Sequence, residues 1–239
     1  MKPSPPCRVP SLRSAALAVG LVLAAGPAAA SGPGGTGAKG EDCAEAVALR
    51  VQGHYEAVRD LRADFVQETR SVALGGGGAV ESAPVRGRVH FAKPGRMRWE
   101  YESPEPSLVV SDSETLWIHD PAAKEVQVLP VGAGFLSGAA IQFLLGEGRV
   151  LETFRVTARD CQGEAVTLVL SPREPATYER LELGVEPASG AIRETRVVDL
   201  FGNRTRVVFE NVETNQDPPA SLFRFEVPEG VRVLELPAS

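Results

Sequence analysis

The fold is decided by the stretch VHFAKPGRMRWEY, residues 89–101. Apolar side chains take every second position on both sides of its Lys-Pro-Gly turn, at Val89, Phe91, Met97, Trp99 and Tyr101. Because successive side chains of a strand point to opposite faces, this alternation predicts a β-hairpin with one strongly apolar face. This alternation fits two roles for the apolar face: it can pack in a filled core, or it can line a cavity.

The two-residue period continues outward from this hairpin in short segments separated by Pro, Gly, Asn or Asp. It predicts strands at 87–91, 97–101, 107–110, 115–119, 125–129, 154–159, 165–171, 180–185, 192–199 and 204–210, with one helical turn or a last edge strand at 221–225. So many antiparallel strands curl rather than stay flat. We therefore expect a mainly β protein with some α (α+β), an incomplete antiparallel half-barrel of about ten or eleven strands.

Helices are predicted at two places. From residue 41, apolar residues recur every three or four positions, at Val47, Val51, Tyr55, Val58, Leu61 and Phe65. A shorter apolar helix is predicted within 135–145, before the stop signal Gly146. Between the first helix and the hairpin, the four glycines 75–78 predict a flexible turn, in keeping with a hairpin tip. With two or three helices over one face, the inside of the curved sheet becomes a candidate cavity.

The N-terminus reads as a signal peptide over residues 1–30, with Arg8 and Arg13 before an apolar run and cleavage near Ala30. A Gly-rich tail is expected at 31–40 and a single domain at 41–239. Removing residues 1–30 takes away three basic residues and no acidic one, which changes the formal net charge from −6 to −9. This balance argues against nucleic acid and against electrostatic docking on anionic lipid. No segment is long and apolar enough to span a bilayer, so we expect a soluble mature chain.

Catalytic and metal-binding patterns were sought next. The three histidines, His54, His90 and His119, lack the spacing of paired metal ligands, and no nucleophile stands with a base and an orienting group. We therefore expect neither an enzyme nor a metal or cofactor. After signal cleavage two cysteines remain, Cys43 and Cys161, which can pair in an oxidising compartment or stay free.

A family resemblance rests on five stretches of the chain. These are KPGRMRWEY (93–101) with the following Ser103-Pro104, LVVSD (108–112), LWIHD (116–120), LRADFVQ (61–67) and FRFEVPEGV (223–231). Together they resemble the periplasmic outer-membrane lipoprotein carrier family, LolA, in matching order over nearly the whole mature chain.

The resemblance implies a hydrophobic cavity under lid helices that receives the acyl chains of lipoproteins. It implies cavity residues at Phe65, Val89, Phe91, Met97, Trp99, Tyr101, Leu108, Val110, Trp117, Ile141, Leu144 and Leu145. It also implies that Lys93, where arginine is common, contacts a lid helix and holds the cavity closed. Lysine lacks the planar fork of arginine, so the closure can differ in strength.

The same resemblance implies a periplasmic, monomeric protein with three partners: acylated lipoproteins, an inner-membrane ABC-type release complex and an outer-membrane acceptor. Two alternatives use the same fold. One is a regulatory protein that senses lipoproteins, and the other is a carrier of lipid or glycolipid in another pathway. Which cargo is carried is not contained in these motifs.

Overall fold

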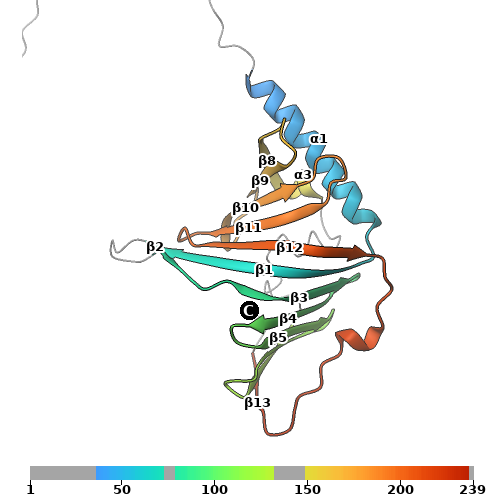
Figure 1. The fold of residues 1–239 in the computed structure, drawn as a ribbon, viewed down its shortest axis with the longest axis vertical. Helices are drawn as coiled ribbons and strands as arrows, with labels where there is room; N and C mark the ends of the chain where they lie inside the picture. Colours follow the sequence, from blue (N-terminus) through green and yellow to red (C-terminus); the bar gives the residue numbers. More distant parts are fainter. Residues whose placement is uncertain (1–35, 73–78, 132–148, 237–239) are drawn as a thin grey trace, which may run out of the picture. The chain divides into compact units, whose positions relative to one another are not determined.

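A computed structural model describes residues 36–72, 79–131 and 149–236 (Figure 1). Helix α1 spans Thr36–Ala57 and the short helix α3 spans Val150–Thr153. The strands are β1 (Asp60–Val72), β2 (Ala79–Glu81), β3 (Val85–Ala92), β4 (Arg96–Ser103), β5 (Ser107–Asp112), β6 (Thr115–Asp120), β7 (Glu125–Pro130), β8 (Phe154–Arg159), β9 (Val166–Pro172), β10 (Tyr178–Val185), β11 (Ile192–Asp199), β12 (Arg204–Thr214) and β13 (Arg232–Glu235), with a 3₁₀ turn η1 at Ala220–Phe223.

All of these strands form one open sheet of 13 strands, in the order β13-β7-β6-β5-β4-β3-β1-β12-β11-β10-β9-β8, with β2 paired to β1. Neighbours are antiparallel except β13, which runs parallel to β7. The predicted mainly β class and unclosed antiparallel sheet are therefore confirmed. The predicted strand number was too low because β1, β2 and β13 were not recognised, and the segment 221–225 contributes a 3₁₀ turn.

The first helix ends earlier than predicted. It begins at Thr36, inside the segment expected to be a tail, and it stops at Ala57. Leu61 and Phe65 lie on β1, where they alternate with exposed or half-buried neighbours and share the buried face with Ala63. A spacing of four residues satisfies both a helical and a strand period, so the pattern was ambiguous at this point. Pairing of β1 with both β3 and β12 decides in favour of the strand.

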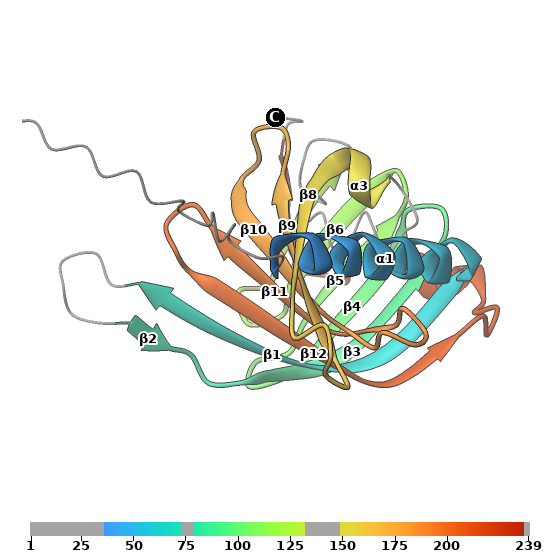
Figure 2. The same cartoon turned by 90° about the horizontal axis from the view of Figure 1, so that it is seen from above.

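Helix α1 lies across the concave side of the sheet (Figure 2). Its buried side chains, Ala44, Val47, Ala48, Val51 and Tyr55, all face inward at helical spacing. The turn between β10 and β11 comes very close to the helix backbone, since a Cβ on Gly190 would stand 2.5 Å from the Arg50 carbonyl oxygen. Gly190 also has a φ of +79°, so a side chain there would be strained twice over.

The main core is one connected apolar cluster between α1, α3 and the concave face. It runs from Phe154 on β8 to Leu129 on β7 and includes residues of most strands between them. A sheet with one apolar face must cover that face, and α1 does so over part of its area.

Three predicted features fall outside the described residues. The four glycines 75–78 are one, although the strands on either side pair antiparallel as a hairpin requires, with Arg70 opposite Glu81. The apolar helix predicted at 135–145 is the other internal feature, and the predicted signal peptide 1–30 is a third feature outside the described residues.

Candidate functional site

An aromatic cluster marks the middle of the concave face. The ring of Phe65 lies 4.9 Å from that of Trp99 and 5.4 Å from that of Tyr101, and Phe91 lies 5.8 Å from Trp99. Gly87, directly opposite Phe65, makes room for this packing, because a Cβ there would stand 2.8 Å from the Phe65 ring. The predicted group Phe65, Val89, Phe91, Met97, Trp99 and Tyr101 is thus brought together on one face.

The indole of Trp99 is a polar exception within this group. Its side chain is buried, with 8 % of the residue exposed, and its Nε1–H has no hydrogen-bond acceptor among the described residues. A buried donor without a partner costs about 1–3 kcal/mol. Unpaired buried groups of this kind are uncommon in folded proteins and call for an explanation.

Lys93 joins the hairpin turn to the end of helix α1. Its Nζ donates to the carbonyl oxygen of Tyr55 at 2.6 Å and to that of Glu56 at 3.4 Å. These carbonyls belong to the last turn of the helix, which has no intrahelical donors for them and carries partial negative charge. Burial lowers the pKa of the Lys93 ammonium, while the Glu56 carboxylate acts to raise it. Lys93 therefore contacts α1 where the resemblance implied that a lid contact would be.

The other end of α1 is held covalently. Cys43 on α1 forms a disulfide with Cys161, which follows β8 and lies 118 residues further along the chain. Between the two ends, the Tyr55 hydroxyl accepts a hydrogen bond from the Ile192 backbone N–H at 3.2 Å. Helix α1 is thus fixed by a covalent bond near its N-terminus and by hydrogen bonds at its C-terminus.

Leu108, Val110 and Trp117 lie on the opposite face of the sheet from this cluster. On β4 and β5, Trp99 stands opposite Val109 and Arg98 opposite Val110, and Val110 in turn stands opposite Trp117. Directly opposed residues share a face, so these three residues share the face of Arg98 and not that of Trp99. The register of the strands therefore places these three residues on the other face of the sheet from Met97 and Trp99, and not beside them as the resemblance implied.

The C-terminal segment explains why this second face is apolar. Phe225 lies 6.2 Å from Trp117 and 5.6 Å from His119, and Phe223 is buried under the guanidinium of Arg96 at 5.3 Å. Arg98 adds a hydrogen bond to the Leu222 carbonyl oxygen. Strands β5 and β6 are therefore covered on both faces, which removes the alternation that the sequence argument relied on.

The concave positions of β5 to β7 were missed by the sequence argument. They are Val109 and Ile118, which pack against the core cluster, and Leu116 and Leu129, which are part of it. The signal that could have found them is the pairing of β4 with β5, since Val109 stands opposite Trp99. Ile141, Leu144 and Leu145 lie outside the described residues.

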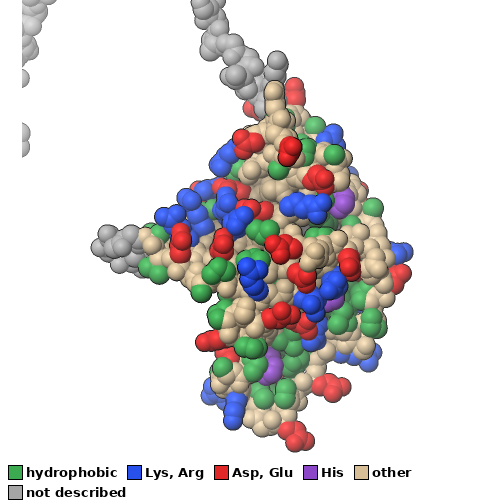
Figure 3. Space-filling model, in the orientation of Figure 1, with side chains coloured by type: hydrophobic (Ala, Val, Ile, Leu, Met, Phe, Trp, Pro, Cys, Tyr) green, Lys and Arg blue, Asp and Glu red, His purple; other side chains and the backbone are tan. Residues whose placement is uncertain are grey.

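The convex face of β10, β11, β12 and β1 carries a network of ion pairs, and Figure 3 shows acidic and basic side chains interspersed over these strands. At its centre is Glu182, whose side chain is 6 % exposed and lies 3.0 Å from Arg180, 2.7 Å from Arg196 and 3.9 Å from Arg159. Burial alone would raise the pKa of Glu182, but hydrogen bonds from Arg180 and Arg196 hold the pKa below its usual range.

Two further observations bear on the class of protein. No group of three or more His, Cys, Asp or Glu side chains in the described ranges is arranged to hold a metal ion. Within the same ranges, none of the helices has both the length and the apolar character needed to cross a bilayer.

An open antiparallel sheet whose apolar face is covered by a helix tethered at both ends defines a half-barrel protein with an apolar interior. The particular family follows from comparison with known proteins: residues 56–226 match the family model described as outer membrane lipoprotein carrier protein LolA, and the chain belongs to this family of carriers.

Relatives support the family over most of the chain. An outer-membrane lipoprotein carrier protein of Chromohalobacter salexigens is 31% identical over 92% of this chain and 95% of its own length. One of Chromobacterium violaceum is 32% identical over 94% of this chain and 96% of its own. A crystal structure of an uncharacterized conserved protein from Thermus thermophilus shares the fold, with a TM-score of 0.50 at 14% identity over 80% of this chain and 98% of that one.

Proposed function

We propose that this chain is a periplasmic carrier that binds the acyl chains of lipoproteins on the concave face of its sheet. The observation that carries the proposal is the aromatic cluster of Phe65, Phe91, Trp99 and Tyr101 beneath a helix whose C-terminal end is joined to the hairpin turn by hydrogen bonds from Lys93. Membership in a family of carriers supports the same function. In this proposal cargo comes from an inner-membrane ABC-type release complex and passes to an outer-membrane acceptor.

The two attachments of α1 suggest how cargo enters and leaves. The disulfide of Cys43 keeps the N-terminal end of the helix over the sheet, while the C-terminal end is held by non-covalent contacts that include the hydrogen bonds from Lys93, so in this proposal it is the end that moves. Each methylene group that enters the apolar face contributes about 0.8 kcal/mol. The closed form, in which α1 packs on the concave face, competes with this binding, because the helix and the acyl chains bind to the same apolar surface. Such competition keeps binding reversible, as a carrier requires.

Trp99 indicates which part of the cargo is recognised. Acyl chains are attached through ester or amide carbonyl groups, and a carbonyl oxygen is the acceptor that the buried indole N–H lacks. In this proposal Trp99 donates to a carbonyl at the head of one acyl chain. The acyl chain is bound through its apolar surface area, and the hydrogen bond from Trp99 to its carbonyl fixes how deeply the acyl chain enters the site.

The test compares two synthetic lipopeptides that differ only in this group. One carries two ester-linked palmitoyl chains on a glyceryl cysteine, and the other carries two ether-linked hexadecyl chains. We expect calorimetry to show the ester form binding about fivefold more tightly than the ether form, the value of one ordinary hydrogen bond. Trp99→Phe should bind both forms equally, at the affinity of the ether form.

The outcomes separate the two parts of the proposal. If neither lipopeptide binds to the protein, the carrier function is wrong. If both bind with equal affinity to the protein and to Trp99→Phe, the carrier function stands and the role of Trp99 is wrong. Mass spectrometry of lipid that copurifies with the protein from periplasm tests the glycolipid alternative, which predicts glycolipid in place of acylated lipoprotein.

A further inference from the structure

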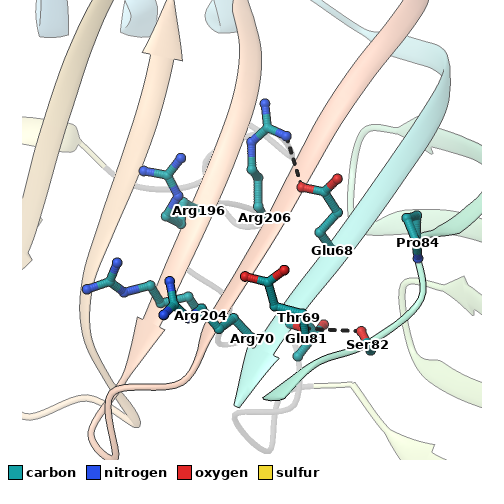
Figure 4. Close-up of a pocket in the computed structure, with 9 residues that line it drawn as sticks. All are labelled: Glu68, Thr69, Arg70, Glu81, Ser82, Pro84, Arg196, Arg204 and Arg206. Atoms are coloured by element: carbon teal, nitrogen blue, oxygen red, sulfur yellow. Dashed lines mark hydrogen bonds and ion pairs between the residues drawn. The ribbon is translucent and has the colours of Figure 1, made fainter. Parts of the chain in front are cut away.

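A hollow lies on the convex side of the sheet, on the other face from the aromatic cluster, at the corner where β1 and β2 end. It encloses about 460 Å³ and is drawn in Figure 4. Its lining is polar and mostly basic, with four arginines and two glutamates: Glu68, Thr69, Arg70, Glu81, Ser82, Pro84, Arg196, Arg204 and Arg206.

Two of its arginines are fully engaged by carboxylates. Arg206 lies 3.0 Å from Glu68 and 2.7 Å from Glu194, and Arg196 lies 2.9 Å from Glu194 and 2.7 Å from Glu182. The hydrogen bonds that Arg206 donates to Glu194 and Glu68 raise the pKa of its guanidinium above its usual range. These two arginines belong to the ion network of the convex face.

Arg70 and Arg204 differ from that pair. They stand directly opposite each other on β1 and β12, and neither forms an ion pair within 4.0 Å among the described residues (Figure 4). Like charges directly opposed across two strands are destabilising. On the other side of β1, Glu81 stands opposite Arg70 and offsets part of this repulsion, although it forms no ion pair with Arg70 within 4.0 Å in the part of the chain that the structure describes. An anion placed between the two arginines would remove this repulsion.

An exposed apolar tip adjoins the two arginines. Val72 follows Arg70 on the same face of β1 and is 47 % exposed, while Leu200 and Phe201 in the β11–β12 turn are 64 % and 76 % exposed. A Cβ on Gly202 of this turn would lie 3.6 Å from the Val72 side chain, so the two elements are in contact. Three large apolar side chains are therefore exposed at this corner, beside two arginines that form no ion pair within 4.0 Å among the described residues.

The tip is held in this position by hydrogen bonds. The Asp199 carboxylate accepts the backbone N–H groups of Phe201 at 2.8 Å and of Asn203 at 2.9 Å. The Asn203 side chain donates to Asp199 at 2.7 Å and accepts from the Val72 backbone N–H at 2.8 Å. These hydrogen bonds fix the backbone of the turn, while the Leu200 and Phe201 side chains stay mostly exposed next to Val72, and adjoining exposed apolar residues of this kind are typical of interaction sites.

We propose that this corner, made of Arg70, Val72, Leu200, Phe201 and Arg204, docks on the surface of a phospholipid bilayer. The two arginines bind lipid phosphate groups, as guanidinium groups do through paired N–H donors. Leu200 and Phe201 enter the boundary between headgroups and acyl chains, where aromatic and aliphatic side chains beside basic ones commonly bind. A site for a free phosphate ion would need the arginines and not the apolar tip.

The position of the corner fits this role and does not depend on the carrier function. The 13 residues of β1 extend about 40 Å, at about 3.3 Å per residue. The start of β1 is next to Lys93, whose backbone N–H donates to the Arg59 carbonyl oxygen, and its end is at the corner. Docking at the corner therefore leaves the Lys93 end of α1 free. Glu68 and Glu81 line the same hollow and oppose the attraction of anionic lipid, as the acidic balance of the chain does, whereas negative charges more than about 8 Å away act weakly on exposed groups at physiological salt. The apolar tip is therefore needed beside the arginines for docking.

The test is sedimentation of the mature chain with vesicles of phosphatidylglycerol and phosphatidylethanolamine, at low and physiological salt. The double variant Arg70→Gln/Arg204→Gln should bind about 30-fold less, because each arginine near an anionic surface contributes about 1 kcal/mol and every 1.4 kcal/mol or so changes the affinity about tenfold. Phe201→Ser should bind about tenfold less, through lost apolar contact. The control variants, Arg155→Gln/Arg224→Gln and Val227→Ser, change exposed residues elsewhere, Val227 being 42 % exposed, and should bind as the unchanged protein does.

Each remaining outcome contradicts the proposal. The bilayer is not the ligand if the protein fails to sediment with vesicles, or if the corner variants and the controls bind alike. A soluble anion is the ligand instead if inorganic phosphate at about the lipid concentration displaces the protein and Phe201→Ser has no effect. Lipopeptide binding by the corner variants is measured in parallel and should be unchanged, so failure here leaves the carrier proposal intact.

Discussion

The two faces of strands β4 to β6 use similar side chains for different purposes. On the concave face, Met97 and Trp99 are buried in the large cluster beneath α1. On the convex face, Val110 and Trp117 lie under the C-terminal segment, beside Phe223 and Phe225. The first face is covered by a helix whose end is held by one lysine, and the second by a segment that leads into β13, a strand paired into the sheet.

This difference separates an apolar surface that can be uncovered from one that is permanent structure. Releasing α1 near Lys93 breaks two side-chain hydrogen bonds. Releasing the C-terminal segment requires breaking the β13–β7 pairing and exposing Phe223, which is 1 % exposed. Releasing α1 would also break the Tyr55–Ile192 hydrogen bond and uncover Val51 and Tyr55, but it would break no strand pairing, so we propose that the concave face is the one that exchanges its cover for a ligand.

The largest expected effect compares one phenylalanine from each face. Phe91→Ala and Phe223→Ala each remove a buried ring, and each should lower the free energy of unfolding by about 3–5 kcal/mol, measured by urea denaturation. The two variants should differ in lipopeptide binding. Phe91→Ala should weaken it, because the ring lines the proposed site, whereas Phe223→Ala should leave the affinity of the folded protein unchanged. Equal weakening by both variants would mean that the faces are not functionally distinct.

A smaller effect concerns the ionic network of the convex face. Glu182→Gln leaves Arg180 and Arg196 without their buried carboxylate and should lower the free energy of unfolding by about 3 kcal/mol at neutral pH. Glu179→Gln, in the same strand, changes an exposed carboxylate that also pairs with Arg180 and should cost less than about 1 kcal/mol.

The loss at Glu182 should depend on pH in a defined direction. The pKa of Glu182 is lower in the folded chain than its ordinary value of 4.5, so folding favours the charged form. Its contribution is complete above pH 4.5 and disappears as the pH falls through the lowered pKa. The stability difference between the protein and Glu182→Gln should therefore be constant from about pH 7 to about pH 5. It should narrow below pH 4.5, and a difference that grows in acid would contradict this assignment.

The smallest effect is expected at the end of α1. Lys93→Met removes the donor to the Tyr55 and Glu56 carbonyls and should cost about 1 kcal/mol of stability. Because the closed form then competes less well with cargo, lipopeptide affinity should rise about fivefold. Lys124→Met, at the β6–β7 turn, serves as the control and should change neither quantity. Unchanged affinity in Lys93→Met would show that Lys93 does not restrain the helix against cargo.

The sequence predicted the strands best where one face of the sheet is polar. The hairpin of β3 and β4 alternates cleanly, because Arg98 and Glu100 point away from Met97 and Trp99, and its cluster was correctly grouped. On β5 and β6 the alternation fails, since Leu108, Val110 and Trp117 are apolar on the convex side. Their cover comes from Phe223 and Phe225, far later in the chain, and no local pattern reveals such a contact.

Other features depended equally on distant contacts. Leu61 and Phe65 fitted a helical period, and only their partners on β3 and β12 make them a strand. The disulfide between Cys43 and Cys161 spans 118 residues, and the sequence left it open because two cysteines can pair or stay free. Arg70 and Arg204 lie far apart in the sequence and meet only through the register of β1 and β12.

The most direct test of the account is to place a photoreactive phenylalanine on each face and add a lipopeptide with radiolabelled acyl chains. Tyr101 on the concave face and Trp117 on the convex face are suitable positions, since both are half-buried aromatic residues. Illumination should crosslink acyl chains to position 101 and not to position 117. Crosslinking at position 117 alone, or at both positions equally, would contradict the claim that the concave face carries the cargo.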